Sequence, residues 1–229
     1  MSIRQNIESV LEKIAVYCRK AGVPEGSVDL VAVSKTVTAD KIKEAYDAGL
    51  RMFGENRVSE FVQKSGNLPE EIKWNLIGQL QTNKVKYIID KSIYLLHSLD
   101  RVSLAKKLQT QCEKRDTEVN ALIQLKLTRE ETKSGVDEDK MDDFLEELEA
   151  FDRIKVKGIM TMGPAFGEEK EIRDVFAKAR NIYDKISSRL TGMEHLSMGM
   201  SQDYGWAILE GSNMVRIGTA VFGDRHYVA

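Results

Sequence analysis

The stretch LVAVSKTV (Leu30 to Val37) begins with a continuous apolar run and places a lysine where that run ends. An apolar run without alternation is typical of a strand buried on both faces, as in a parallel sheet covered by helices. Most lysines at strand ends are solvated, so Lys35 alone does not indicate a site. Whether this lysine has a special role depends on the rest of the chain.

Similar short apolar runs recur along the chain and alternate with stretches of helical periodicity. The expected strands are residues 30–34, 52–54, 74–78, 94–99, 119–125, 156–162, 195–198 and 214–222. The expected helices between them are residues 39–48, 55–64, 82–90, 101–114, 138–149, 168–190 and 202–209. Strict alternation, with connections long enough for right-handed crossovers, predicts a parallel sheet covered by helices.

Eight strands favour closure of the sheet into an α/β barrel, and 229 residues is a common length for that fold. We therefore expect a single (β/α)8 TIM-type barrel domain over residues 1–229, because no linker-like stretch divides the chain. The alternative is an open doubly wound sheet, which needs a glycine-rich nucleotide-binding turn after the first strand. The segment AVSKTVTADK (residues 32–41) contains no glycine, which counts against this alternative.

The N-terminal segment repeats apolar residues at the spacing of one helix face. Ser2 and Gln5 form a capping-box pattern at its start, and Gly22 suits its end. No helical pattern follows the strand expected at residues 214–222. We therefore expect the N-terminal helix to cover the seam that an eighth crossover helix would otherwise fill.

The composition is that of an ordinary globular protein, with 42% hydrophobic residues, 31% charged residues and a net charge of -2. This balance argues against a nucleic-acid binder. Charges throughout residues 1–21 argue against a signal peptide or a membrane span, so we expect a cytoplasmic protein. Cys18 and Cys112 lie in amphipathic patterns without metal-site spacing, and we expect reduced structural thiols and no metal.

In a barrel of this kind, function lies at the C-terminal ends of the strands, where the connecting loops gather. Polar side chains and glycines occur at those positions throughout this chain. They are Lys35, Asn56, Gly78, Gln79, His97, Ser98, Lys126, Thr161, Ser197, Arg216, Gly218 and Thr219.

The loops after the last two strands are the most informative, because they often bind phosphate in this fold. SMGMSQD (residues 197–203) supplies a glycine and the Ser201 hydroxyl just before an expected helix, where free N–H groups favour an anion. RIGTAVFG (residues 216–223) supplies Gly218 and the Thr219 hydroxyl. A helix cap at Ser201 and a turn at Gly218 are the simpler interpretations, but the adjacency of the two loops favours a phosphate cup.

A phosphate cup facing a lysine on the first strand suggests a phosphorylated aldehyde held as a Schiff base. Lys35 must be neutral to attack a carbonyl group, and burial against Val31 and Val33 disfavours its ammonium form. Arg216 could hydrogen-bond a pyridine nitrogen, and a cation there keeps the ring unprotonated and weakens it as an electron sink. A surface salt bridge is the alternative role for Arg216.

A series of motifs runs in order along nearly the whole chain: VAVSKT, AGLRMFGENRVSE, IGQLQTNK, HSLD, KSGV, GIMTM, LSMGMSQDYGWAI and EGSNMVRIGTAVFG. Together they resemble the pyridoxal phosphate homeostasis proteins, a family similar in fold to the N-terminal barrel of alanine racemase. The resemblance implies pyridoxal 5'-phosphate held as a Schiff base on Lys35. It also implies phosphate contacts from Ser201, Gly218 and Thr219, backbone contacts around Met200, a contact from Asn56, and a pyridine-nitrogen partner at Arg216.

Members of that family are described as binders that keep vitamin B6 and amino-acid pools in balance, without an established catalytic turnover. Alanine racemase uses a second base from a separate β-domain, and this chain ends at Ala229 soon after the last expected strand. Abstraction of a proton needs a base within reach on the correct face. We therefore expect no catalytic residue.

The chain departs from the family pattern at Asn75, where relatives have histidine, at Gln79, where they have histidine, arginine or proline, and at Lys126, where they tend to have asparagine. These three positions concern any second contact with the ligand. None of them is among the cofactor-contact residues that the resemblance implies. Lys126 is either an additional lysine near the pocket mouth or a strand-end lysine that reaches solvent.

Three functions from different classes remain open. The favoured one is a monomeric carrier of pyridoxal phosphate that passes the cofactor to apo-enzymes and binds neither nucleic acid nor membrane. The second is a weak racemase or lyase that depends on the same cofactor. The third is a stable barrel, engineered or degenerate, that retains the motifs without the activity.

Overall fold

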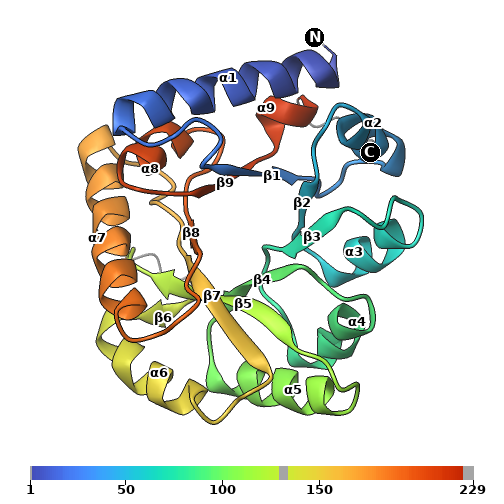
Figure 1. The fold of residues 1–229 in the computed structure, drawn as a ribbon, viewed down its shortest axis with the longest axis vertical. Coiled ribbons are helices and arrows are strands. Elements are labelled where there is room, and N and C mark those ends of the chain that lie inside the picture. The colour runs from blue at the N-terminus through green and yellow to red at the C-terminus, as the bar shows by residue number, and fades with distance from the viewer. Residues whose placement is uncertain (1, 129–133, 224–229) are drawn as a thin grey trace.

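The computed structural model describes residues 2–128 and 134–223. Its centre is a ring of parallel strands wrapped by helices (Figure 1). The ring consists of β1 (Asp29–Val33), β2 (Met52–Glu55), β3 (Lys73–Leu76), β4 (Leu95–Leu99), β5 (Val119–Lys126), β7 (Ile154–Met160), β8 (His195–Ser197) and β9 (Met214–Ile217). It closes because β9 pairs with β1 and β4 pairs with β5. The predicted barrel is confirmed, and the open doubly wound sheet is excluded.

Every connection between ring strands carries a helix on the outside of the barrel (Figure 1). These helices are α2 (Ala39–Asp47), α3 (Val58–Ser65), α4 (Val85–Asp90), α5 (Val102–Glu113), α6 (Met141–Leu148), α7 (Glu169–Ser187) and α8 (Tyr204–Leu209). Short 3-10 turns, Thr82–Lys84 and Glu138–Lys140, precede α4 and α6. A small strand that was not expected, β6 (Val136–Asp137), pairs with β5 outside the ring.

The last predicted strand, residues 214–222, is shorter than expected. It ends at Ile217, and a helical turn, α9 (Thr219–Phe222), follows it, so the expectation that nothing helical comes after the last strand is wrong. Val221 and Phe222 are buried in α9, and the Asn6 side chain donates to the Val221 carbonyl at 3.1 Å. Periodicity alone does not separate a short buried helix from a short buried strand.

The N-terminal helix, α1 (Ile3–Ala21), lies against α8, α9 and α2 on the outside of the β9–β1 seam (Figure 1). The capping box is present: the Ser2 hydroxyl accepts the Gln5 N–H at 3.3 Å, and the Gln5 side chain accepts the Ser2 N–H at 2.9 Å. Gly22 ends the helix with a φ of +71°. The apolar face buries Ile3, Ile7, Val10, Ile14 and Cys18. The predicted cover over the seam is confirmed.

Two apolar clusters occupy the two sides of the ring. The smaller one lines the barrel interior and consists of Val31, Leu95, Leu122, Met160 and Met214. The larger one joins the outer faces of the strands to the helices. It includes Ala32, which follows Val31 on β1. Because successive side chains of a strand face opposite sides, Val33 belongs to the interior face, like Val31.

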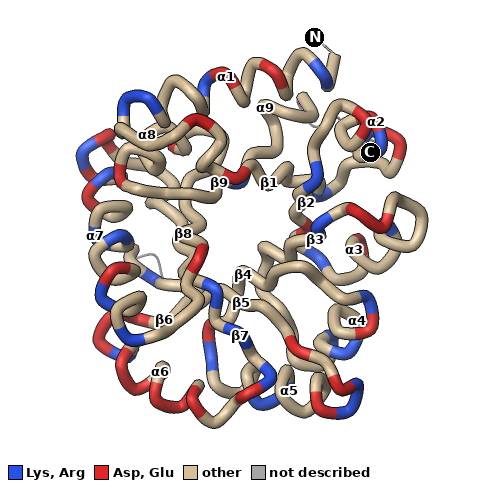
Figure 2. Tube along the Cα trace, viewed as in Figure 1, with Lys and Arg blue, Asp and Glu red and all other residues tan. Residues whose placement is uncertain are grey.

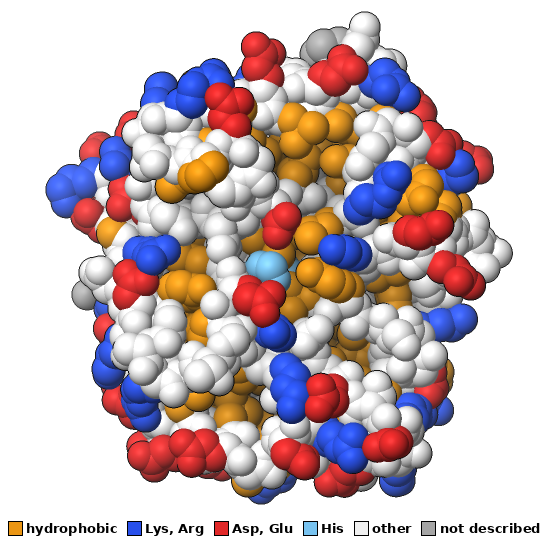
Figure 3. All heavy atoms as spheres, in the orientation of Figure 1, with side chains coloured by type: hydrophobic (Ala, Val, Ile, Leu, Met, Phe, Trp, Pro, Cys, Tyr) orange, Lys and Arg blue, Asp and Glu red, His pale blue; other side chains and the backbone are white. Residues whose placement is uncertain are grey.

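Charged residues lie mainly on the helices and loops, with both signs interspersed (Figure 2). On the face shown in Figure 3, acidic and basic side chains of the described residues border hydrophobic atoms without forming a patch of one sign. Within the two described ranges, no helix is long and apolar enough to cross a membrane. Cys18 and Cys112 are buried free thiols, and burial raises the pKa of Cys112 to about 11.

Candidate functional site

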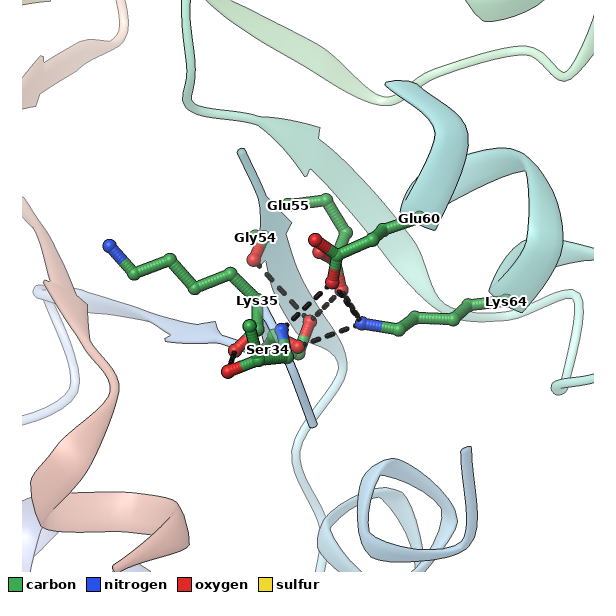
Figure 4. Close-up of polar contacts among 7 residues, drawn as sticks. Ser34, Lys35, Gly54, Glu55, Glu60 and Lys64 are labelled. Carbon is green, nitrogen blue, oxygen red and sulfur yellow. Dashed lines mark hydrogen bonds and ion pairs between the residues drawn. The ribbon is translucent and has the colours of Figure 1, made fainter. Parts of the chain in front are cut away.

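The end of β1 lies between the ends of β9 and β2. Ala32 pairs with Ile217 on one side, and Val33 pairs with Gly54 on the other. Lys35 follows β1 by two residues, so it lies between the loop after β9 and the loop after β2. It is half-buried, and its side chain extends away from the charged groups of α3 (Figure 4).

Arg216 is buried inside the barrel, with only 4% of its surface exposed. Its Nη1 donates to the Ser197 hydroxyl at 2.6 Å, and its Nη2 donates to the Thr161 carbonyl at 2.9 Å. Burial lowers the pKa of Arg216 to about 10, partly opposed by the charge of Asp203, so the guanidinium stays protonated at neutral pH. The alternative role as a surface salt-bridge partner is therefore wrong.

A hydrogen-bonded chain continues from Arg216 across the barrel interior. The Ser197 hydroxyl lies 3.3 Å from His97 Nδ1, and His97 Nε2 lies 3.0 Å from Asn75 Oδ1. Burial and the charge of Arg216 keep the pKa of His97 well below its usual value. Because the Ser197 oxygen accepts from Arg216, we assign its hydroxyl as the donor to His97 Nδ1. The neutral His97 ring then carries its proton on Nε2, which donates to Asn75 Oδ1.

Sequence reasoning noted His97 and Ser197 as strand-end polar groups and Asn75 as a departure, but it did not join them. The signal available was their position on otherwise apolar strands, where a buried polar side chain requires a partner. The identity of each partner depended on the register of β3, β4 and β8.

The loop after β8 carries two of the expected phosphate contacts. Ser201 is half-buried and Met200 is 40% exposed, so both are in part open to solvent. The Met200 N–H already donates to Asp203 Oδ1 at 2.5 Å. The helix α8 begins at Tyr204, two residues later than expected, so the simpler interpretation of Ser201 as its N-cap is wrong.

The loop after β9 adjoins the loop after β8, because the Arg216 N–H donates to the Gly199 carbonyl at 3.0 Å. Gly218 is half-buried and Thr219 is exposed. A Cβ atom at Gly218 would lie 3.2 Å from the Val33 carbonyl, so glycine allows this loop to approach the end of β1 closely. The structure thus brings Gly218 and Thr219 beside the strand that leads to Lys35.

Asn56 lies on the other side of Lys35, in the loop after β2, and is half-buried. A Cβ atom at Gly78 would lie 2.2 Å from the Asn56 carbonyl, so this loop packs directly against the end of β3. Gln79 is exposed. Lys126 ends β5, which is separated from β1 by three strands of the ring, so it is not a neighbour of Lys35 in the sheet.

Neither a metal centre nor a cluster of metal-ligand type is found among residues 2–128 and 134–223: no group of three or more His, Cys, Asp or Glu side chains could hold an ion. His226 lies outside these described residues. The polar groups at the barrel mouth are instead an amine, hydroxyls, glycine backbone and a buried guanidinium.

Comparison with known proteins identifies the family. Residues 6–226 match the family described as alanine racemase, N-terminal domain. A relative from Aquifex aeolicus, named pyridoxal phosphate homeostasis protein, is 40% identical over 99% of this chain and 100% of its own length. The chain belongs to the pyridoxal phosphate homeostasis protein family.

Two solved structures are similar to this barrel in both fold and sequence. A crystal structure of an unknown protein from Bifidobacterium adolescentis has a TM-score of 0.91 and 34% identity, and the match covers 96% of this chain and 94% of that one. PipY of Synechococcus elongatus, solved with pyridoxal phosphate bound, has a TM-score of 0.83 and 31% identity, with coverage of 97% and 100%. Both solved structures thus share this barrel along nearly the whole chain.

Proposed function

We propose that this protein binds pyridoxal 5'-phosphate as a Schiff base on Lys35 and acts, without catalytic turnover, in vitamin B6 and amino-acid homeostasis. The observation that carries the proposal is the position of Lys35 just past the end of β1, the strand that pairs with β9 and its buried Arg216 on one side and with β2 on the other. The cofactor bound to PipY, a relative of the same length and fold, supports it. Residues 1–229 would serve as one cofactor-binding domain.

The groups at the barrel mouth match the chemistry of the cofactor. Bound pyridoxal phosphate supplies an aldehyde that an amine can hold covalently and a ring that can withdraw electrons. The Lys35 amine would bond the aldehyde carbon, and the carbonyl oxygen would leave as water. The Ser201 and Thr219 hydroxyls and the Gly218 backbone would bind the phosphate, and Asn56 would contact the ligand from the opposite side.

Met200 would contribute to phosphate binding through its backbone. Its N–H is paired with Asp203 Oδ1 at 2.5 Å, so a phosphate oxygen has to replace that carboxylate oxygen as the acceptor. This replacement also moves the negative charge of Asp203 away from the phosphate. The loss of that repulsion favours phosphate binding. We therefore expect Met200 to contribute less than the groups whose donors are available without rearrangement.

Arg216 supports a binding role over a catalytic one. Two of its nitrogens are held by Ser197 and Thr161, which fixes the guanidinium plane inside the barrel. Its charge at neutral pH would keep a facing pyridine nitrogen unprotonated, which weakens the ring as an electron sink. His97, a buried histidine in the barrel interior, has both ring nitrogens engaged and a lowered pKa, so it is poorly suited to act as a base.

The partners that follow from this role are the cofactor and the apo-enzymes that would receive it. We propose a monomer in the cytoplasm that contacts neither nucleic acid nor membrane. The proposal is distinguished from a racemase or lyase by exchange of the α-proton of an amino acid into deuterated solvent, which a carrier should not accelerate.

The deciding experiment is an absorption spectrum after incubation with pyridoxal 5'-phosphate, followed by borohydride reduction and peptide mass mapping. Lys35→Ala is the test variant, and Lys126→Ala is the matched control because Lys126 is also a half-buried lysine at the end of a barrel strand. We expect one reduced adduct on Lys35, lost in Lys35→Ala and kept in Lys126→Ala. An adduct on Lys126, or no adduct, would contradict the proposal and favour a barrel without a working site.

A further inference from the structure

Lys35 occupies the second position of a tight turn at the end of β1. The Val37 N–H donates to the Ser34 carbonyl at 2.9 Å and closes this turn. Thr36, at the third position, has a φ of +63°. Glycine usually supplies such a conformation, and a β-branched residue adopts it only when its surroundings impose it. The turn that carries Lys35 is therefore strained.

Side chains of β2 and α3 contact the residues on both sides of Lys35 (Figure 4). Lys64 Nζ donates to the Ser34 carbonyl at 2.9 Å, and Glu60 Oε2 accepts the Thr36 N–H at 2.8 Å. Lys64 also bridges the two acids, at 2.8 Å from Glu55 Oε1 and 3.0 Å from Glu60 Oε2. We call Glu55, Glu60 and Lys64 the turn clamp.

The turn clamp is largely removed from water. The side-chain exposures are 0% for Glu55, 10% for Lys64 and 21% for Glu60. The Lys64 ammonium has three N–H donors, and each has an acceptor here. Glu55 Oε2 is buried without a hydrogen-bond partner, so the set is not fully paired. Such a set of charges is costly to bury, and its best-attested use is to fix one geometry.

The pKa values of the two acids of the turn clamp are shifted in opposite directions. Burial raises the pKa of Glu55 and outweighs its bonds from Lys64 and Ser34. Burial acts on Glu60 in the same direction, but hydrogen bonds from Thr36 and Lys64 outweigh it and lower the pKa. Glu60 is therefore ionised at neutral pH, and an ionised acceptor strengthens its bond from the Thr36 N–H.

We propose that Glu60 and Lys64 are positioning residues for Lys35: they hold Ser34 and Thr36 in the strained turn and so direct the Lys35 amine toward the barrel mouth. Figure 4 shows the Lys35 side chain leaving the turn on the side away from the clamp, so the clamp acts through the backbone. This inference rests on the proposed function in one respect, namely that the Lys35 amine reacts with the aldehyde of pyridoxal phosphate.

Four variants of the full chain test the clamp. Glu60→Ala removes the acceptor of the Thr36 N–H, whereas Glu60→Gln retains a side-chain oxygen that can accept it. Glu60→Ala combined with Thr36→Gly removes the clamp and the strain together, because glycine adopts a positive φ without cost. Glu210→Ala is the matched control, since Glu210 is 20% exposed and also pairs with a basic side chain, Arg173, but lies at the end of α8.

Two measurements separate a positioning role from a merely structural one. The first is hydrogen exchange of the Thr36 and Val37 amides in protein without cofactor. The second is the rate at which a borohydride-trapped adduct appears on Lys35 after mixing with pyridoxal 5'-phosphate. The melting temperature of each variant is recorded alongside, so that a general loss of stability is recognised.

We expect Glu60→Ala to speed the amide exchange and slow adduct formation, each about tenfold, because small misplacements of a reacting group have large effects on rate. Glu60→Gln and the double variant should recover most of the adduct rate, and Glu210→Ala should leave both rates unchanged. An unchanged adduct rate in Glu60→Ala, with a wild-type protein that forms the adduct, would overturn the positioning role. If the wild type forms no adduct on Lys35, the proposed function fails, and the exchange rates alone then decide whether the clamp holds the turn.

Discussion

At the residue scale, the buried charge of Arg216 lies inside the barrel in a hydrogen-bonded chain with His97, whose neutral ring it favours. Arg216 is buried yet protonated at neutral pH, and it donates to Ser197, which in turn faces His97 Nδ1. A second proton on His97 would place a donor against that serine and a positive charge near the guanidinium. The arrangement therefore favours the neutral ring, in agreement with the lowered pKa of His97.

This coupling predicts a pH-dependent stability. Unfolded His97 titrates near its ordinary pKa of about 6.5, whereas the folded ring titrates well below it, so the unfolded state binds more protons between the two values. The free energy of unfolding should fall as pH drops below about 6.5, with a contribution approaching about 1.4 kcal/mol per pH unit. His97→Gln should lose this contribution.

Urea unfolding of the wild type and of His97→Gln at pH 7.5 and 5.5 measures the contribution of His97 to the pH dependence of stability. Glu55 acts in the opposite direction, because its raised pKa makes the folded state bind more protons than the unfolded state. Both proteins contain Glu55, so the difference between them isolates His97. Parallel losses of stability in the two proteins would contradict the assignment.

At the element scale, α1 completes the barrel although it precedes the first strand. Its buried face packs over α8 and α9, two short helices of six and four residues, which flank the strand that closes the ring. Short helices are weak on their own and depend on packing for their stability. The helix therefore supports the same two loops that we propose for phosphate binding.

Substitutions on the two faces of α1 should differ strongly in effect. Ile7 is 2% exposed and Leu11 is 44% exposed. Ile7→Ala should lower the free energy of unfolding by about 2–5 kcal/mol through lost burial and a cavity. Leu11→Ala, on the same helix, should change it by less than about 0.5 kcal/mol. Denaturant unfolding of both variants checks this, and equal effects would mean that α1 does not pack as described.

At the scale of the whole molecule, the proposed site draws on opposite ends of the chain. Lys35 lies near the N-terminus and Gly218 near the C-terminus, and the pairing of β1 with β9 brings them together. A ligand that bonds both would link the first and last strands of the ring. Binding to the folded state alone stabilises it by mass action.

Pyridoxal 5'-phosphate should therefore stabilise the closed barrel. At 100 times its dissociation constant the free energy of unfolding should rise by about 2.7 kcal/mol, with a higher melting temperature. Lys35→Ala should lose most of this gain, and Lys126→Ala should keep it. Thermal unfolding with and without the cofactor measures the shift, and an equal shift in all three proteins would place the binding elsewhere.

The barrel was predictable because its strands and helices each carry a local signature. Buried runs such as residues 30–34 need no knowledge of their partners, and the place of Lys35 just after the first strand assigns it to the C-terminal end of the barrel once the barrel is accepted. The same local reasoning failed at residues 219–222, where α9 replaces a strand because packing against α1 decides its conformation.

By itself the sequence determined the closed α/β barrel, its family and the lysine at the end of the first strand, because periodicity, motif order and strand parity are properties of neighbouring residues. The tertiary structure decided which groups meet. The chain from Arg216 to Asn75 and the turn clamp at Lys64 join residues from different strands and helices. Such contacts depend on sheet register and helix placement, and these are set only when the whole ring closes.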